Sequence, residues 1–294
     1  MKKPFIGIVG GTGKTGLQFA RFFKRKGYRV AISHYDKNKA ERVAKKNNLV
    51  GKNDYEIIKD CNVVFFSLPL EKTEKIIKEL APLARPGMLL SDFTSLKVRP
   101  LKVMLKTSKS GVNVIGLHPL FGPSVRKFEG QTIAVVPGRG KKYLKWLKNL
   151  FSDEGMKVKV CTAEEHDKMM AVVQCLTHFS SIVTADALRR LSIDVKESLK
   201  FASPLYRIKM DISGRILSQD PALYSSIQIL NSYSKKVIKE FIKSSKELDN
   251  KIRKKDRNGF ISYFRKASKF LGSLKKQATK ESDYLIEKLA VIGD

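Results

Sequence analysis

The 294-residue sequence is poor in cysteine. Its three cysteines are widely spaced and include no Cys-x-x-Cys pair: Cys61, Cys161 and Cys175. An odd number of isolated cysteines argues against a disulfide framework and against a zinc ribbon. The cysteine content therefore favours a protein of the reducing cytoplasm.

Long apolar runs are also missing. The longest, residues 63–70, has the length of a strand and is interrupted by Ser67 and Pro69, so we expect no membrane-spanning helix. The apolar run near the start of the chain stops at Gly10–Gly11, too early for the core of a signal peptide.

Acidic residues are scarce: 28 Asp and Glu face 58 Lys and Arg, a net charge of +30. Such a charge suits phosphates, carboxylates, nucleic acid or an anionic membrane without choosing among them. Residues 235–280 hold 16 basic and 4 acidic residues, but their aromatic residues fall on apolar helix faces. This arrangement favours solvated helices over a nucleic-acid surface, which needs aromatic side chains to stack on bases. A hydrophobic content of 42% excludes a disordered chain.

Strand-like and helix-like segments alternate through the first half of the chain. Such alternation predicts βαβ units and a mostly parallel, doubly wound sheet of the Rossmann type. The expected helices are residues 17–26, 37–46 and 71–83, and the expected strands are residues 5–9, 29–33, 63–68, 88–92, 112–117, 132–136 and 157–161.

Beyond about residue 163 only helical periodicity remains. Apolar residues recur at helical spacing over 164–191 and again near the end of the chain, where Asn258–Gly259 indicates a turn between two helices. The sequence thus predicts an α/β dinucleotide-binding domain over residues 1–163 and an all-α domain over residues 164–294.

A glycine-rich motif follows the first expected strand and opens a helix. Its six residues, all assigned to a cofactor site, are Gly11, Thr12, Gly13, Lys14, Thr15 and Gly16. This Gly-x-Gly-x-x-Gly spacing after a strand is typical of dinucleotide binding, with the pyrophosphate at the positive end of the helix dipole. A nucleotide-hydrolase phosphate loop would need glycine where Ile8 stands.

The end of the second strand bears on the choice of cofactor. NAD is usually marked there by an acidic residue that binds the ribose, and here the position falls on His34, after Ser33. Ser33, His34 and the lysines that follow favour the 2′-phosphate of NADP, whereas Asp36 could serve NAD. Either cofactor remains open, with a slight preference for NADP.

His118 directly follows the expected strand 112–117, at the carboxyl edge of the sheet, within Gly116-Leu117-His118-Pro119-Leu120-Phe121-Gly122-Pro123. Ligands of doubly wound folds bind at this edge of the sheet, and the prolines stiffen the loop. A histidine there could act as a general base. No metal site is expected, since His166 and His178 lie too far apart in the sequence for a zinc motif.

Several motifs together resemble the prephenate dehydrogenases, to which the arogenate dehydrogenases are closely related. The segments that carry the resemblance are Gly11–Gly16, Asp92–Lys97, His118–Pro123, Glu165–Asp167, Gln174–Phe179, Ala202–Arg207 and Gly214–Arg215. The chain has room for the two dehydrogenase domains but not for a fused chorismate mutase domain. The resemblance implies NAD(P)-dependent oxidative decarboxylation of prephenate to 4-hydroxyphenylpyruvate and CO2 in tyrosine biosynthesis.

The resemblance also assigns roles to individual residues. It makes His118 the catalytic base, with Ser95 orienting it or the substrate hydroxyl, and it places the substrate against Arg215, His178 and, less strongly, Arg207. Without the resemblance, Arg207 could instead belong to a surface ion pair. His178 could instead be a buried histidine of the core.

Leu68 and Pro69 complete the expected cofactor site. The helical domain is expected to form a homodimer. Arogenate dehydrogenase or another NADP-linked two-domain dehydrogenase is the first alternative. A phosphate- or nucleic-acid-binding protein is the alternative from another class.

Overall fold

The computed structural model describes residues 3–292, which divide into two compact units. The first, which we call the sheet unit, comprises Met1–Met170 and Ser225–Ser232. The second, the helical unit, comprises Ala171–Tyr224 and Tyr233–Asp294. The expected boundary at 163/164 remains a prediction.

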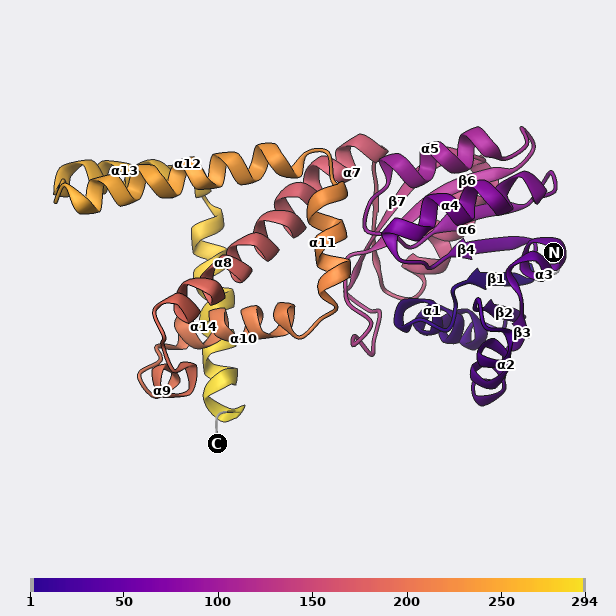
Figure 1. Ribbon diagram of the computed structural model, residues 1–294, viewed down its shortest axis with the longest axis horizontal. Helices are drawn as coiled ribbons and strands as arrows, with labels where there is room; N and C mark the ends of the chain where they lie inside the picture. The colour runs from indigo at the N-terminus through magenta and orange to yellow at the C-terminus, as the bar shows by residue number, and fades with distance from the viewer. Residues whose placement is uncertain (1–2, 293–294) are drawn as a thin grey trace. The chain divides into compact units, whose positions relative to one another are not determined.

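An eight-stranded sheet in the order β3-β2-β1-β4-β5-β6-β7-β8 forms the centre of the sheet unit (Figure 1). All neighbours are parallel except β6 and β7. The strands are β1 (Ile6–Val9), β2 (Val30–Ser33), β3 (Val50–Lys52), β4 (Val63–Phe66), β5 (Leu89–Asp92), β6 (Asn113–Pro119), β7 (Thr132–Arg139) and β8 (Lys157–Val160). The predicted Rossmann-type, doubly wound sheet is confirmed.

Side chains that alternate along the buried strands feed two separate cores, one on each face of the sheet. On one face Phe65 packs with α1, α2 and α6; on the other, Phe66 packs with α3, α4 and α5. The helices are α1 (Lys14–Arg25), α2 (Lys37–Lys46), α3 (Asp54–Asp60), α4 (Leu70–Leu80) with the short η1 (Ala81–Leu83), α5 (Val98–Thr107) and α6 (Lys141–Ser152).

A continuous helical stretch leads out of the sheet unit. It consists of α7 (Ala163–Met170), a π-helical turn η2 (Ala171–Leu176) and α8 (Thr177–Arg190). By length and composition alone, Ala163–Arg190 could cross a membrane, with a mean hydropathy of 1.2 and only 17% of its most apolar window buried. A single helix that passes by length and composition is weak evidence for a membrane span, so the expectation that no helix spans a membrane stays a prediction.

The helical unit contains helices only in its described residues. It comprises α8, α9 (Val195–Lys200), α10 (Pro204–Leu217), α12 (Ser234–Arg253), α13 (Arg257–Leu271) and α14 (Leu274–Ile292), and α11 (Pro221–Leu230) is shared between the two units. Helices α12 and α13 run side by side as a hairpin (Figure 1). An all-helical second part was predicted and is confirmed.

The turn between α12 and α13 lies earlier than expected. It occupies residues 254–256, where Lys255 adopts a positive φ of 54°, whereas Asn258 and Gly259 lie in the first turn of α13. The Asp256 side chain accepts a hydrogen bond from the Gly259 N–H and thereby caps the helix. Asn258–Gly259 is a strong turn signal, but here the capping aspartate decides where the helix begins.

Candidate active site

The glycine-rich motif forms the turn from β1 into α1. Gly10, rather than Gly11, adopts the left-handed conformation, with φ of 73°. Gly11 is required for a different reason, because a Cβ there would lie 2.7 Å from Ile32 of β2. At Gly16 a Cβ would lie 2.8 Å from the Gly11 Cα, so this glycine lets α1 pack against the turn. The loop lies where the sequence predicted it, and its tight turn is made by Gly10, one residue before the motif.

Space for a ligand remains above the start of α1. Gly13 is exposed, and a Cβ on it would meet only the Gly10 carbonyl oxygen, at 3.4 Å. Helix α1 begins at Lys14 with no side-chain cap and no acidic residue in its first turn. Its first amides and the positive end of its dipole therefore suit a pyrophosphate.

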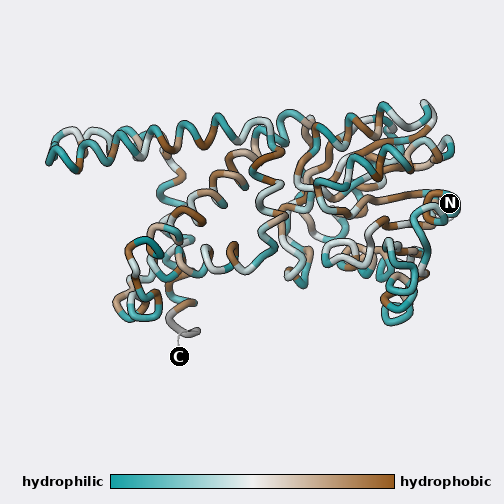
Figure 2. The backbone as a smooth tube through the Cα atoms, viewed as in Figure 1, coloured by the Kyte–Doolittle hydropathy of each residue, from teal (hydrophilic) through white to brown (hydrophobic). Residues whose placement is uncertain are grey.

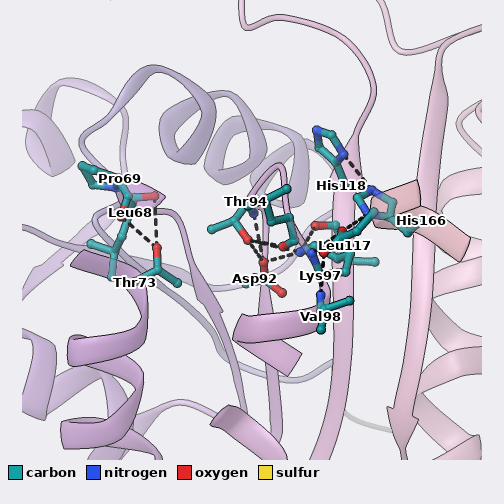
Figure 3. Close-up of polar contacts among 12 residues, drawn as sticks. Leu68, Pro69, Thr73, Asp92, Thr94, Lys97, Val98, Leu117, His118 and His166 are labelled. Atoms are coloured by element: carbon teal, nitrogen blue, oxygen red, sulfur yellow. Dashed lines mark hydrogen bonds and ion pairs between the residues drawn. The ribbon is translucent and has the colours of Figure 1, made fainter. Parts of the chain in front are cut away.

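Leu68 and Pro69 lie beside this loop, at the end of β4. A Cβ on Gly10 would lie 2.8 Å from Leu68 Cδ2, so Leu68 forms a wall of the turn. Pro69 precedes α4, and its carbonyl accepts a 2.9 Å hydrogen bond from the Thr73 hydroxyl (Figure 3). Both residues thus occupy the expected edge of the sheet.

The residues at and after the end of β2 differ in how accessible their side chains are to a ligand. Ser33 is fully buried, and its hydroxyl donates to Asp54. Asp36 accepts a hydrogen bond from the Lys39 N–H and caps α2. His34 is partly exposed, and its Nδ1 accepts from the Asp36 N–H at 3.1 Å. The exposed ring of Tyr35 lies over the His34 ring, with 4.1 Å between the centroids.

His118 lies on β6 itself, one residue before the strand ends, whereas the sequence predicted it just after the strand. It is 3% exposed, and its Nδ1 lies 2.9 Å from His166 Nε2 (Figure 3). His166 Nδ1 lies 2.7 Å from Asp167 Oδ1. The carboxylate of Asp167 can only accept, so it fixes the proton on His166 Nδ1. His166 then accepts at Nε2 from His118 Nδ1–H.

Burial holds the pKa of His118 well below its usual value of 6.5, and the neighbouring His166 and Lys97 lower it further. The imidazole is therefore neutral at pH 7. Because its proton sits on Nδ1, the basic nitrogen of His118 is Nε2. This arrangement of carboxylate, oriented imidazole and base follows the logic of a catalytic triad.

The sequence analysis assigned no catalytic role to His166 or Asp167. The signal lay in the resemblance itself, since Glu165-His166-Asp167 was among the matching segments. Asp167 is also structural: its two carboxylate oxygens accept from the N–H groups of Lys97 and Val98 at 2.8 and 3.0 Å. It therefore joins α7 to the start of α5 as well as orienting His166.

The glycine loop and His118 lie at the same edge of the sheet. The glycine loop follows β1, Leu68 follows β4, Ser95 follows β5, and His118 is near the end of β6. Since β1, β4, β5 and β6 are consecutive parallel neighbours, three strand spacings, about 14 Å, separate the loop from His118. Ser95 is half-buried in the turn between β5 and α5.

The residues expected to hold the substrate carboxylate belong to the helical unit. His178 on α8 packs against Tyr224, with their ring centroids 4.4 Å apart. The charge of Arg215, on α10, also acts on Tyr224, where it opposes the rise in the pKa of that phenol caused by burial. His178 and Arg215 therefore gather around a tyrosine that sequence reasoning missed. Arg207 forms a 3.4 Å ion pair with Asp211 on the exposed side of the same helix.

Among the described residues, no group of three histidine, cysteine or acidic side chains is placed to hold a metal ion.

The fold and the site define an oxidoreductase class, the NAD(P)-dependent dehydrogenases in which a helical part follows a Rossmann-type sheet. Comparison with known families narrows this class. Residues 19–160 match the family described as prephenate dehydrogenase, nucleotide-binding domain, and residues 162–266 match prephenate dehydrogenase, dimerization domain. The chain belongs to the prephenate dehydrogenase family, as the resemblance predicted. The glycine motif precedes the matched range, so its assignment depends on the structure.

Individual relatives agree with this assignment. A probable arogenate/prephenate dehydrogenase of Methanocaldococcus jannaschii is 40% identical over 282 residues, which are 95% of this chain and 63% of the relative. The T-protein of Haemophilus influenzae is 32% identical over 96% of this chain and 71% of its own length. The chain thus spans less than two thirds of the archaeal relative.

Solved structures support the fold. The prephenate dehydrogenase of Aquifex aeolicus, in complex with hydroxyphenyl propionate and NAD+, superposes with a TM-score of 0.76 at 20% identity, covering 95% of this chain and 99% of that one. Synechocystis arogenate dehydrogenase gives a TM-score of 0.71 at 18% identity, covering 90% and 97%.

Proposed function

We propose that this protein oxidises prephenate with NADP, releasing 4-hydroxyphenylpyruvate and CO2, as a step of tyrosine biosynthesis. The observation that carries the proposal is the hydrogen-bonded chain from Asp167 through His166 to His118. It places an oriented, neutral base on a strand end that shares its edge with the glycine loop.

The proton steps follow from the assigned tautomers. His118 Nε2 accepts the proton of the substrate's ring hydroxyl as the carbonyl develops, a role worth about 10²–10⁴-fold in rate. The new positive charge is stabilised through Nδ1 by His166 and the Asp167 carboxylate. A bound nicotinamide would supply the acceptor for the hydride that leaves the hydroxyl-bearing carbon. Loss of CO2 from the resulting ring ketone makes the ring aromatic and provides the driving force, and the phenolate oxygen takes the proton back from His118. Ser95 would orient the hydroxyl at the end of β5.

Arg215 is the proposed partner of a substrate carboxylate, because its planar guanidinium donates two parallel hydrogen bonds. His178 and Tyr224 would line the same subsite. Burial lowers the pKa of His178 to about 4, so this histidine is neutral and contributes hydrogen bonding rather than charge. Arg207, already paired with Asp211, is the weaker candidate.

NADP is proposed over NAD because the end of β2 offers a partly exposed His34 with Lys37 and Lys39, while the Asp36 carboxylate caps α2. A 2′-phosphate would gain positive partners there, whereas a ribose hydroxyl would lack the usual acidic acceptor. Ser33 would act beneath the site through Asp54 rather than by touching the phosphate.

A homodimer through the helical unit is proposed from its exposed apolar side chains. Figure 2 shows hydrophobic positions recurring along the helices of this unit. Ile182 and Val183 of α8 and Ile242 and Ile252 of α12 are exposed. Exposed apolar surface of this extent is typical of an interaction surface. It also offers an account of the apolar helix Ala163–Arg190 in a protein of the cytoplasm.

One assay tests the substrate and the cofactor together. Reduced-nicotinamide absorbance is followed with prephenate and then with arogenate, each with NADP and with NAD. We expect the highest kcat/KM for prephenate with NADP, because Arg126 and Lys127 follow the His118 loop and suit a dianion over a zwitterion. A preference for arogenate would make this an arogenate dehydrogenase. No turnover, with RNA or DNA affinity that survives 0.2 M salt, would support the nucleic-acid alternative.

A further inference from the structure

Lys97 is an unusual residue because its side chain is completely buried. Lysine is among the residues least often buried unless its charge is paired. Here the ammonium forms an ion pair with Asp92, itself fully buried at the end of β5, and donates to the Leu117 carbonyl at 2.7 Å (Figure 3). A third, longer contact of 3.3 Å reaches the Thr94 hydroxyl. All three protons of the ammonium therefore have acceptors.

Strand β6 makes room for this side chain. Gly116 lies on β6 two residues before His118, and a Cβ on it would approach Lys97 Cδ to 3.0 Å and Asp92 Oδ1 to 3.4 Å. A glycine here costs strand stability. That cost is understandable if the aliphatic part of Lys97 has to cross the strand to reach the Leu117 carbonyl.

The backbone of Lys97 makes a second connection to the same histidine. Its N–H donates to Asp167 Oδ1 at 2.8 Å, the oxygen that also receives His166 Nδ1. The Asp167 backbone carbonyl is held in turn by Asn231 Nδ2 at 2.9 Å. Lys97 is thus connected to His118 in two ways. Its ammonium binds the carbonyl of Leu117, the residue before His118. Its N–H binds Asp167, which binds His166, and His166 binds the His118 ring.

We propose that Lys97 is the positioning residue for His118, holding its backbone through the ammonium and its imidazole through Asp167 and His166. The proposal rests on the proposed function only for its kinetic consequence. The geometry it describes exists whatever the substrate is.

The charge of Lys97 adds an electrostatic effect to the geometric one. The groups facing His118 within the sheet unit are His166 and Asp167 from α7, Lys97 from the β5–α5 turn and, behind it, Asp92. Lys97 is one of the causes that hold the pKa of His118 low. Removing its charge should therefore raise that pKa.

The test compares Lys97→Gln with a control, Lys106→Met, which changes an exposed lysine of α5, the helix that directly follows Lys97. Imidazole signals of 15N-labelled histidine are followed against pH in the intact protein. With only four histidines, substitution of each assigns the signals. In Lys97→Gln we expect the pKa of His118 to rise by roughly one unit, and its Nδ1–H tautomer to become a mixture. Lys106→Met should leave both unchanged.

Steady-state kinetics provide the second readout. Lys97→Gln should lower kcat by about tenfold or more, with the cofactor Kd unchanged. In a plot of kcat against pH, the pH below which activity is lost should move to a higher value. If the buried Asp92 prevents this variant from folding, the charge-balanced Asp92→Asn/Lys97→Gln variant replaces it, with the same expectations.

A folded variant whose His118 titration and tautomer match the wild type would overturn the proposal. If neither prephenate nor arogenate is turned over by the wild type, the proposed function fails. The histidine spectra still decide the role of Lys97 in that case.

Discussion

His118 and Asp167 are hydrogen-bonded to the same imidazole: His166 contacts His118 Nδ1 at 2.9 Å and Asp167 Oδ1 at 2.7 Å. The carboxylate therefore decides, through one intervening ring, which nitrogen of His118 carries the proton. The relationship joins β6 to α7, which are far apart in the sequence. It underlies the predictions for Asp167 and His118.

The first prediction concerns the direction of the hydrogen bonds from His118 through His166 to Asp167. Asp167→Asn has one oxygen where the carboxylate has two. With the NH2 group in the place of Oδ1, the oxygen still serves the Val98 amide, but His166 now faces a donor, which reverses both tautomers, and the Lys97 amide loses its acceptor. We expect kcat to fall by about 10²-fold or more, with a loss of stability of about 1–3 kcal/mol from the unpaired amide. Steady-state kinetics and thermal unfolding measure the two effects. Glu164→Gln, an exposed change on the same helix, is the control, and equal kinetics in the two variants would contradict the assigned direction.

The two glycines of the cofactor loop should respond differently to alanine. At Gly13 a methyl group fits but fills the space above α1, so we expect the dinucleotide Kd to rise by tenfold or more at nearly constant Tm. At Gly16 the methyl group would collide with the Gly11 backbone, costing about 1–3 kcal/mol of stability. Fluorescence titration and calorimetry distinguish the two. Unchanged cofactor affinity in Gly13→Ala would remove the pyrophosphate from this position.

Arg215 should act in substrate binding. Arg215→Gln removes the forked donor, so KM for prephenate should rise by tenfold or more while the cofactor Kd stays the same. Arg207→Gln, which breaks only the surface pair with Asp211, is the matched control on the same helix and should change KM less than twofold. If the two variants behave in the opposite way, Arg207 becomes the carboxylate partner.

Stability should fall in mild acid because of two histidines. In the folded state the pKa of His118 lies well below 6.5 and that of His178 is about 4. Below pH 6.5 the unfolded chain binds more protons than the folded chain, so the free energy of unfolding decreases as pH falls from about 6.5 towards 4. Chemical denaturation of wild type, His118→Gln and His178→Gln across this window measures the effect. Each variant should show a smaller slope, and identical slopes would contradict buried neutral histidines.

Seven of the strands could be located along the sequence because they are continuous apolar runs separated by amphipathic helices. The helix over 37–46 was predicted at its observed bounds. Strand β3 was missed because Val50-Gly51-Lys52 is short and only half-buried. Helix α3 was missed although Asn53 and Glu56 form a capping box, a signal that was present. Helices α5 and α6 were also not anticipated.

Candidate site residues could be chosen from the sequence where one residue type carries the chemistry, as at His118 and the glycines, and their roles stay predictions. Site residues could not be chosen where the role depends on a contact. His166 becomes part of the site only because α7 lies against β6, and Tyr224 only because its ring meets His178. Ser33 and Asp36 looked equally available in the sequence, but one is buried against Asp54 and the other caps a helix.

The most direct test of the account is the His118→Asn variant, assayed for prephenate oxidation and for dinucleotide binding in parallel. Asparagine keeps a polar group of similar reach but has no basic nitrogen. We predict that kcat falls by at least about 10²-fold, with the cofactor Kd within twofold of the wild type. Normal turnover in a folded His118→Asn protein would show that the base lies elsewhere.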